Sequence, residues 1–377
     1  MATQFYPGQT LGIIGEGING PMLAQTARQM GFRVAAYSPE AQSEILHLAD
    51  LRFTGNFYNW EQLRAFAESV DFVTYESQDV PSETLSFLQQ YTNLPQGTEA
   101  LDITMDRLME RTLLEENNIN VLPYSSAIDL DDVVTSAVRL GYPVALKPIQ
   151  KTFDHGRERV IEGPASIGRV ADLIDTGTFI VESWLHNIRE FSVVAAKGID
   201  GKIQMFPIVE NIFKNKQLIE TMTPVKLADE VEFEMQRVAE VLGNVLNYRG
   251  AYEVDFYLTE SGNLITKRMV ATLSRPSAIF TQVTNLSVYE QHIRAIAGLP
   301  LSLVTASSPA VLVPFNEIDD DTLRTQWLIK DNWHFTFYHN AGHSLQTAKG
   351  HFVATGTDLR SLLEQIDATG IIGKKTD

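Results

Sequence analysis

The sequence predicts a mixed α/β and α+β fold, with an N-terminal parallel α/β layer, a larger central part and a small C-terminal lobe. Three observations predict it. Short apolar strands alternate with helical segments from residue 11 to about residue 100, the pattern of a parallel sheet covered by helices. Antiparallel hairpins dominate the middle of the chain. The 377 residues exceed one typical hydrophobic core, so we expect two or three domains.

The N-terminal layer is predicted from its apolar runs and from the residues that end its helices. "LGIIG" reads as a buried strand, and the helix that follows it is closed by Gly31, a residue that favours helix ends. The pattern then repeats twice. The predicted segments are strand 11–15, helix 21–31, strand 32–38, helix 60–70 and strand 72–77.

The rest of the chain mixes long helices with hairpins. We expect helices at 104–118, 230–246, 289–297 and 357–366, and strands at 141–149, 178–185, 334–340 and 350–356. Residues 189–212 and 250–269 each read as a hairpin, the first around a Gly-Ile-Asp-Gly turn. "GLPLSL" (298–303) resembles a linker before the last lobe.

Composition limits the classes of partner. The net charge of −17 argues against nucleic acid and against anionic membranes. The absence of cysteine excludes disulfides and thiolate chemistry. The sequence contains no run of about 18 apolar residues that would span a bilayer, and its N-terminus lacks the pattern of a secretory signal. We therefore expect a cytoplasmic protein that acts on a small-molecule substrate.

A glycine-rich motif, "GEGING" (15–20), lies between the first strand and the first helix. Such a turn lets phosphate approach a helix N-terminus. The acid that a dinucleotide site needs at the end of the next strand is missing, since Glu40 comes two residues late. A phosphate-bearing small substrate or a purely structural turn therefore fits better than NAD.

A second candidate site begins at Lys147, a cation at the end of a buried strand. A lysine that snorkels to the surface is the alternative interpretation. The polar loop after it is suited to folding over phosphates, and "VESWL" (181–185) offers a strand edge that could hydrogen-bond adenine. Glu190 follows, with a carboxylate suited to ribose hydroxyls.

In the order and spacing of these features the chain resembles the ATP-grasp superfamily, and within it the 5-(carboxyamino)imidazole ribonucleotide synthases of purine biosynthesis. The resemblance covers most of the chain, including "IIGEGINGPMLAQTARQMGFRV", "MDRLMERTLLEENNINVLPY", "LGYPVALKP" and "YEQHIRAIAGLPL". It implies a Rossmann-like pre-ATP-grasp domain (1–103), an ATP-grasp domain (104–299, with lobes at about 104–181 and 182–299) and a C-terminal lobe (300–377). It also implies a homodimer.

The resemblance implies that ATP and bicarbonate form carboxyphosphate, whose carboxyl group passes to the amine of aminoimidazole ribonucleotide, with Mg²⁺ bridging the phosphates. Lys147 and Arg268 would be the catalytic cations. The positions that would contact ATP are Arg107, Lys147, Thr152, Phe153, Asp154, Glu182, Ser183, Trp184, Leu185, Glu190, Phe213, Lys267 and Arg268. Those that would contact the substrate are Gly17, Asn19, Glu76 and Lys349.

Several positions depart from the family pattern. Lys151 and Thr152 replace the paired glycines of the phosphate loop, and Phe213 replaces a histidine. On the substrate side, Gln78 occupies the position where the family has a second acid, and the Arg-Lys pair expected before Gly350 is missing.

The largest departure is at the metal. Asp255 provides one carboxylate, but the Asn-Glu pair expected on the next strand is Lys267-Arg268. If Ser261-Gly262 forms a two-residue turn, Asp255 lies opposite Arg268, and we hypothesise an ion pair in place of Mg²⁺. Both cations could instead face the phosphates of ATP, or a slipped register could turn them to solvent.

These departures leave two functional hypotheses. The first is a ligase of the family type, or a related ligase with a different acceptor. The second is a catalytically impaired paralogue that binds nucleotide or a metabolite without family-type turnover.

Overall fold

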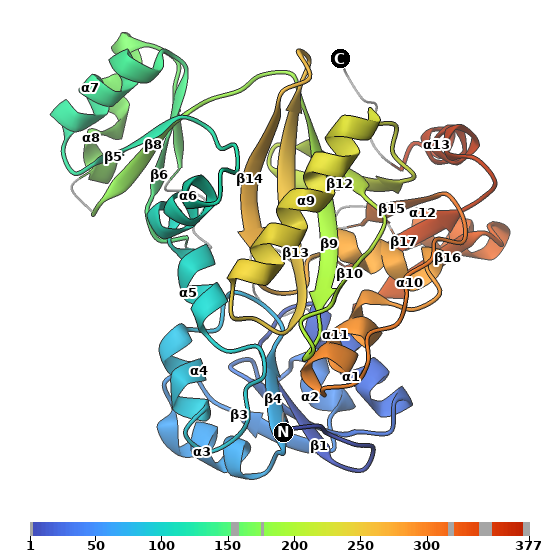
Figure 1. Cartoon of the computed structure of the whole chain (residues 1–377). Helices are drawn as coiled ribbons and strands as arrows, with labels where there is room; N and C mark the ends of the chain where they lie inside the picture. The colour runs from blue at the N-terminus through green and yellow to red at the C-terminus, as the bar shows by residue number, and fades with distance from the viewer. Residues whose placement is uncertain (1–2, 152–157, 175–176, 316–319, 339–348, 372–377) are drawn as a thin grey trace.

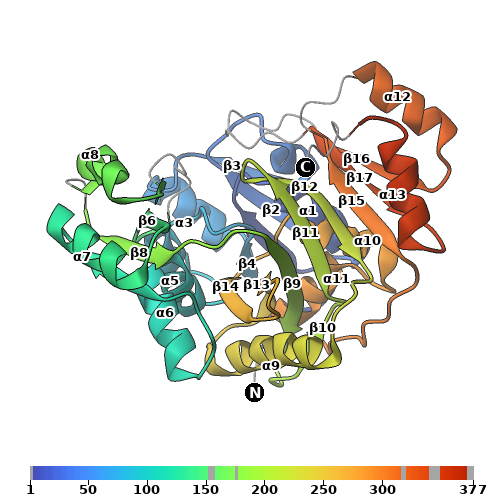
Figure 2. The same cartoon turned by 90° about the horizontal axis from the view of Figure 1, so that it is seen from above.

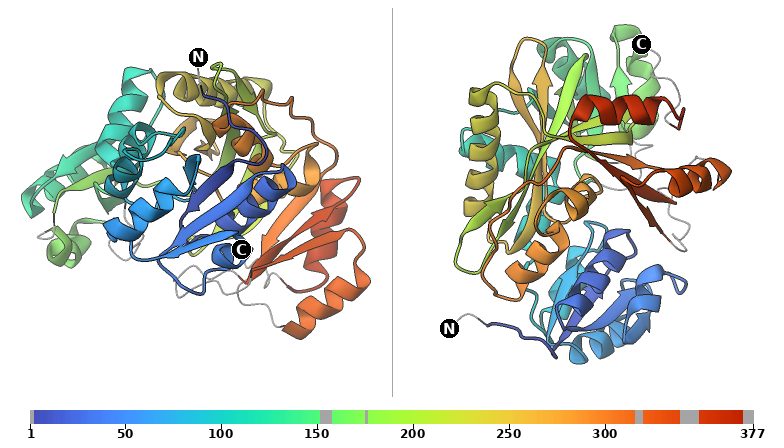
Figure 3. Two further views of the ribbon diagram at one scale, coloured as in Figure 1. Left: turned by 90° about the horizontal axis from the view of Figure 1, so that it is seen from below. Right: turned by 90° about the vertical axis from the view of Figure 1, so that its right-hand side faces the viewer.

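The computed structural model describes residues 3–151, 158–174, 177–315, 320–338 and 349–371. The N-terminal part is a parallel sheet, as the sequence predicts, and its four strands lie in the order β3-β2-β1-β4; β3 was not among the predicted strands. It lies at one end of the molecule, below the central sheet (Figures 1 and 3). Its elements are β1 (Thr10–Ile14), α1 (Asn19–Gln29), β2 (Arg33–Ser38), α2 (Glu44–Leu48), β3 (Leu51–Thr54), α3 (Trp60–Glu68), β4 (Phe72–Tyr75) and α4 (Ser82–Leu88).

The helix expected at 104–118 is two helices that meet at Asp106. The Asp106 side chain caps the second helix by accepting from the backbone N–H groups of Leu108 and Met109. A four-stranded antiparallel sheet in the order β5-β8-β6-β7 follows and forms the first lobe. These elements are α5 (Glu99–Met105), α6 (Arg107–Glu116), β5 (Tyr124–Ala127), α7 (Leu130–Leu140), β6 (Val144–Pro148), β7 (Arg159–Ile161), η2 (Pro164–Val170), α8 (Ala171–Ile174) and β8 (Phe179–Ser183).

The central sheet has nine strands in the order β14-β13-β9-β11-β12-β15-β17-β16, with β10 paired to β9. Both predicted hairpins are present in it. Its first part consists of β9 (Ile188–Lys197), β10 (Ile203–Met205), β11 (Val209–Lys214), β12 (Gln217–Thr223), α9 (Asp229–Val245), β13 (Gly250–Thr259), β14 (Leu264–Val270), η3 (Pro276–Ile279), α10 (Phe280–Val283) and α11 (Val288–Ile296).

The C-terminal elements extend this same sheet. They are β15 (Ala310–Pro314), α12 (Asp320–Ile329), β16 (Trp333–Phe337), β17 (Gly350–Thr355) and α13 (Leu359–Asp367). Because β15 pairs with β12, the predicted limit at residue 299 falls between two strands of one continuous sheet. The limits at 103, 181 and 299 stay predictions.

The two faces of the central sheet differ in chemistry. Helix α9 covers one face and packs on Val193, Val254, Phe256 and Met269 (Figures 1 and 2). Side chains alternate along a strand, so Ser192 and Asp255 lie on the opposite face, which borders the first lobe and the N-terminal domain. The candidate site lies on this polar face.

Candidate functional site

The β13–β14 hairpin brings the two unexpected cations to the polar face, but by a different route from the predicted one. The prediction of a two-residue turn is wrong. The backbone N–H of Thr259 donates to Asn263 O, and Leu258 lies opposite Leu264. This register is one residue away from the prediction. A β-bulge then inserts Lys267, so that Arg268 still lies opposite Asp255.

The expected ion pair between Asp255 and Arg268 is present. Arg268 Nε lies 2.7 Å from Asp255 Oδ2, and the hydroxyl of Ser192 donates to Asp255 Oδ1 at 2.6 Å. Burial alone would raise the pKa of Asp255, but Arg268 and Lys267 outweigh it and lower the pKa to about 2. The Arg268 side chain is 43% exposed, so a ligand on the polar face could contact it.

Lys267 faces the same side of the sheet. Its Nζ lies 2.7 Å from Glu190 Oε2, and 5.2 Å and 5.1 Å from the ring centres of Phe213 and Tyr257. Both distances suit cation–π attraction. The structure therefore brings Glu190, Phe213 and Lys267, three of the predicted nucleotide contacts, together in one cluster.

The surroundings of Asp255 do not fit a magnesium ion. Both of its oxygens already accept short bonds from protein donors, and Mg²⁺ requires near-octahedral oxygen ligands. Glu253, on the same face, is hydrogen-bonded to Ser192 and Ser274, and burial and the neighbouring Asp255 hold its pKa well above its usual range. Within the described ranges, no group of three or more Asp, Glu, His or Cys side chains is placed to bind a metal.

The first lobe contributes a buried charge cluster around Glu182. Its carboxylate accepts from Lys147 Nζ at 2.8 Å and from Arg111 Nη2 at 2.7 Å, and its side chain is 1% exposed. Burial raises the pKa of a carboxyl, but the two cations outweigh this effect and hold the pKa of Glu182 far below its usual range. Glu182 is therefore ionised, and its side chain orients Lys147.

Arg107 is the first residue of α6. Its Nη2 lies 2.7 Å from Glu158 Oε1, and Glu158 also accepts from Lys216 Nζ at 3.2 Å, which reaches across from the β11–β12 turn. The ion pair between Glu158 and Lys216 therefore links the first lobe to the central sheet. The predicted phosphate-loop contacts Thr152, Phe153 and Asp154 lie outside the described residues.

The predicted adenine hinge, Glu182 to Leu185, lies at the end of β8. The Ser183 N–H donates to Pro123 O and the Trp184 N–H to Pro143 O, both at 3.0 Å. These two donors therefore serve the protein itself, and an adenine ring would have to be recognised by other groups of the segment.

The glycine motif surrounds a carboxylate of the protein. The Gly17 N–H donates to Glu76 Oε1 at 2.5 Å, and a Cβ at Gly17 would lie 2.8 Å from both oxygens of Glu76. Burial raises the pKa of Glu76 to about 7. Because Glu76 fills the place that a ligand phosphate would take, the structural interpretation of the motif is favoured over a phosphate site.

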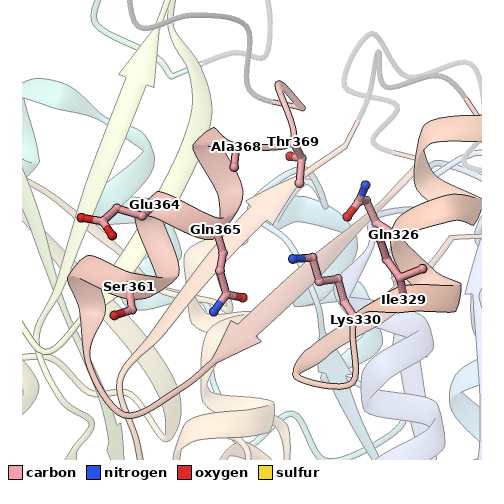
Figure 4. Close-up of a pocket in the computed structure, with 8 residues that line it drawn as sticks. All are labelled: Gln326, Ile329, Lys330, Ser361, Glu364, Gln365, Ala368 and Thr369. Atoms are coloured by element: carbon pink, nitrogen blue, oxygen red, sulfur yellow. The ribbon is translucent and has the colours of Figure 1, made fainter.

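The predicted substrate contacts fall into two places. Gly17, Asn19 and Glu76 come together at this motif, where Asn19 donates to Leu273 O and accepts from Tyr289. Lys349 instead pairs with Asp320 at 3.3 Å, and both side chains are more than half exposed. A separate open depression between α12 and α13 contains none of the predicted site residues (Figure 4).

Sequence reasoning missed three charged groups of these ion-pair clusters: Glu110, Arg111 and Lys216. A signal for two of them existed. Arg107, Glu110 and Arg111 are spaced i, i+3 and i+4 on a predicted helix, which places them on one helical face. Lys216 gives no such signal, since its contact depends on how the lobes pack.

Comparisons with known proteins agree with this architecture. A family model described as "ATP-grasp domain" matches residues 112–272, and one described as "Ribonucleotide synthetase preATP-grasp domain" matches residues 8–105. A solved N5-carboxyaminoimidazole ribonucleotide synthetase, in an ADP complex, superposes with a TM-score of 0.93 at 26% identity over 98% of both chains. The ADP complex of the Staphylococcus aureus N5-carboxyaminoimidazole synthetase gives 0.91 at 24% identity, over 98% of each chain, and shows the fold alone.

Curated relatives share the same name. The N5-carboxyaminoimidazole ribonucleotide synthase of Bacillus subtilis is 32% identical over 308 residues, 82% of this chain and 81% of its own length. That of Staphylococcus saprophyticus is 26% identical over 96% of this chain and 97% of its own. No helix in the described part of the chain is long and apolar enough to cross a membrane. The chain belongs to the N5-carboxyaminoimidazole ribonucleotide synthase family of ATP-grasp proteins.

Proposed function

We propose that the cleft between the first lobe and the polar face of the central sheet binds ATP, and that the chain is an ATP-dependent carboxylate–amine ligase of its family's type. Bicarbonate would be the carboxylate and aminoimidazole ribonucleotide the amine. The observation that carries the proposal is the row of cations along the cleft. They come from both lobes: Arg107, Arg111, Lys147, Lys151, Lys267 and Arg268.

These cations are held in place by carboxylates of the protein. Each is paired within 2.7–2.8 Å with one of Glu110, Glu158, Glu182, Glu190 and Asp255. With Lys216, which also pairs with Glu158, seven cations face five carboxylates, so the cluster is positive in a chain whose net charge is −17. A polyphosphate is the small-molecule anion that such a prearranged row would attract.

In this proposal the charge of Mg²⁺ is replaced by side chains of the protein. Guanidinium groups can neutralise charge on a transferring phosphoryl group, and Arg268 is exposed to the cleft. Lys147, oriented by Glu182, is the second group that we expect to act on the phosphates. No step of the proposed reaction requires a metal at Asp255.

A second candidate function is nucleotide binding without turnover. The Arg268–Asp255 pair favours it, because an arginine supplies charge but not the octahedral arrangement of ligands that aligns in-line transfer. Further support comes from Lys349, which pairs with Asp320 and not with the groups around Glu76.

Two measurements test both candidates. In isothermal titration with ATP, the dissociation constant should be the same with Mg²⁺ and with EDTA. Phosphate release should then be measured with ATP, bicarbonate and aminoimidazole ribonucleotide, leaving out one reactant at a time. Release that needs all three reactants establishes the ligase. ATP binding without such release establishes the second candidate, and the absence of ATP binding would refute both.

The proposal extends to the setting of the protein. We propose that it is a cytoplasmic homodimer that acts on small molecules, which is what the family resemblance implies. Sedimentation or light scattering at micromolar concentration would test the dimer.

A further inference from the structure

Glu110, which the proposed function uses only as the partner of Lys151, is a buried carboxylate with a second contact. It lies on α6 and is 2% exposed. Its Oε1 accepts from the backbone N–H of Met269 at 2.8 Å, and its Oε2 accepts from Lys151 Nζ at 2.7 Å. One side chain therefore joins helix α6, strand β14 and the start of the phosphate loop.

The contact with Met269 lies on an edge strand, next to a bulge that interrupts its pairing with β13. Among the described residues β14 is the edge strand of the nine-stranded sheet, and its outer side has one isolated bridge, between Thr266 and Val121. The bulge at Lys267 also interrupts the ladder to β13. Two outer N–H groups flank the bulge: that of Thr266 donates to Asn120 O at 2.8 Å, and that of Met269 donates to Glu110.

We infer that Glu110 is a positioning residue: through its bond to Met269 it fixes the bulged strand so that Lys267 and Arg268 both face the cleft. The inference rests on the proposed function in one respect, namely that these two cations receive the phosphates of the ligand. Glu110 itself contacts the strand and Lys151, and is not expected to touch the ligand.

The comparison of two substitutions separates positioning from simple electrostatics. The Glu110 carboxylate, 2.7 Å from Lys151 Nζ, opposes the lowering of the Lys151 pKa by burial, so any substitution that removes the carboxylate charge also favours the neutral form of Lys151. Losing the bond to Met269 should weaken binding, because the two cations lose their fixed place. Glu110→Gln removes the charge but keeps an oxygen that accepts from Met269, whereas Glu110→Ala removes both.

The experiment compares these two variants in the full chain, with ATP and with inorganic tripolyphosphate as probes in isothermal titration. Both variants lose the same carboxylate charge, so the difference in affinity for the two probes reports the bond to Met269. Glu110→Ala should bind them about tenfold more weakly than Glu110→Gln, the effect of losing about one hydrogen bond to an ordered group. Glu116→Gln and Glu116→Ala, at the exposed end of the same helix, should differ by less than twofold.

Amide hydrogen exchange provides a readout that does not depend on ligand binding. Exchange at Met269 should be faster in Glu110→Ala than in Glu110→Gln, with equal rates in α9. If Glu110→Ala does not fold, Glu110→Asp replaces it, since it keeps the charge but shortens the reach, and should bind more weakly than the wild type. Equal affinities and equal exchange in the alanine and glutamine variants would overturn the inference. A wild type that binds neither probe would refute the proposed function, while exchange at Met269 would still test the positioning.

Discussion

Replacing Arg268 by glutamate should convert the site to one that depends on magnesium. In the wild type the guanidinium holds Asp255 ionised, with a pKa of about 2 against an ordinary 3.8. A shift of this size corresponds to a stabilisation on the order of 2 kcal/mol at neutral pH. Because the folded-state pKa is lowered, this stabilisation is complete above the ordinary pKa and is lost as the pH falls towards 2. Arg268→Glu removes it and places a second carboxylate opposite Asp255.

The lost stability should return when a divalent cation binds between the two carboxylates. A ligand at about one hundred times its dissociation constant stabilises the folded state by about 2.7 kcal/mol. The midpoint of urea unfolding of Arg268→Glu should therefore be lower than that of the wild type in EDTA, and should recover in millimolar MgCl₂. The wild-type midpoint should be the same in both buffers.

Two further variants serve as controls. Arg268→Met loses the ion pair but gains no carboxylate, so it should be destabilised in both buffers. Arg237→Glu makes the same charge change on α9, where Arg237 pairs with Glu234 on the exposed helix surface, and should not respond to magnesium. If the unfolding midpoint and the ATP affinity of Arg268→Glu are both indifferent to magnesium, the placement of Arg268 in the metal's position is wrong.

The remaining predictions concern buried groups. Glu182→Gln should lower the free energy of unfolding by about 3 kcal/mol in urea denaturation at pH 7, because two cations lose their buried carboxylate. Gly17→Ala should cost about 1–3 kcal/mol through its clash with Glu76, and the cost should shrink in a Glu76→Ala background, which a double-mutant cycle measures. Stability should fall as the pH drops from 6.5 to about 3, because burial lowers the pKa of His292 to about 3 and only the unfolded state takes up its proton. His292→Gln should remove the uptake of about one proton on unfolding in this pH range. The urea midpoint of the variant should therefore change less with pH than that of the wild type.

Local patterns predicted much of the fold correctly. Periodicity is sufficient to find elements that depend on neighbours in sequence, namely β1, α1, β2, α3, β4 and the hairpins at β9–β10 and β13–β14. The short elements α2 and β3 between them were not predicted. The helix break at Asp106 was missed, although an aspartate followed by a helical run is a capping signal. The extension of the central sheet by β15 was also missed, since it pairs strands about ninety residues apart.

The candidate site was predictable only in part, for the same reason. Opposite charges at Asp255 and Arg268 pointed to an ion pair, because both lie on one hairpin. The partners of Lys267 and Met269 lie on β9 and α6, about 80 and 160 residues earlier in the chain. No spacing rule connects such positions, and the packing of the lobes decides them.

The bulge that corrects the register follows from the two faces of the sheet. Thr266 and Met269 are both 2% exposed and lie opposite Phe256 and Val254, on the face covered by α9. Residues three apart in a regular strand point to opposite faces, so both can face α9 only if one residue is extra. In an unbulged strand a charged side chain would be forced into this apolar layer, at a cost of several kcal/mol. Lys267 is therefore the inserted residue, and the same insertion brings its ammonium group to the cleft beside Arg268.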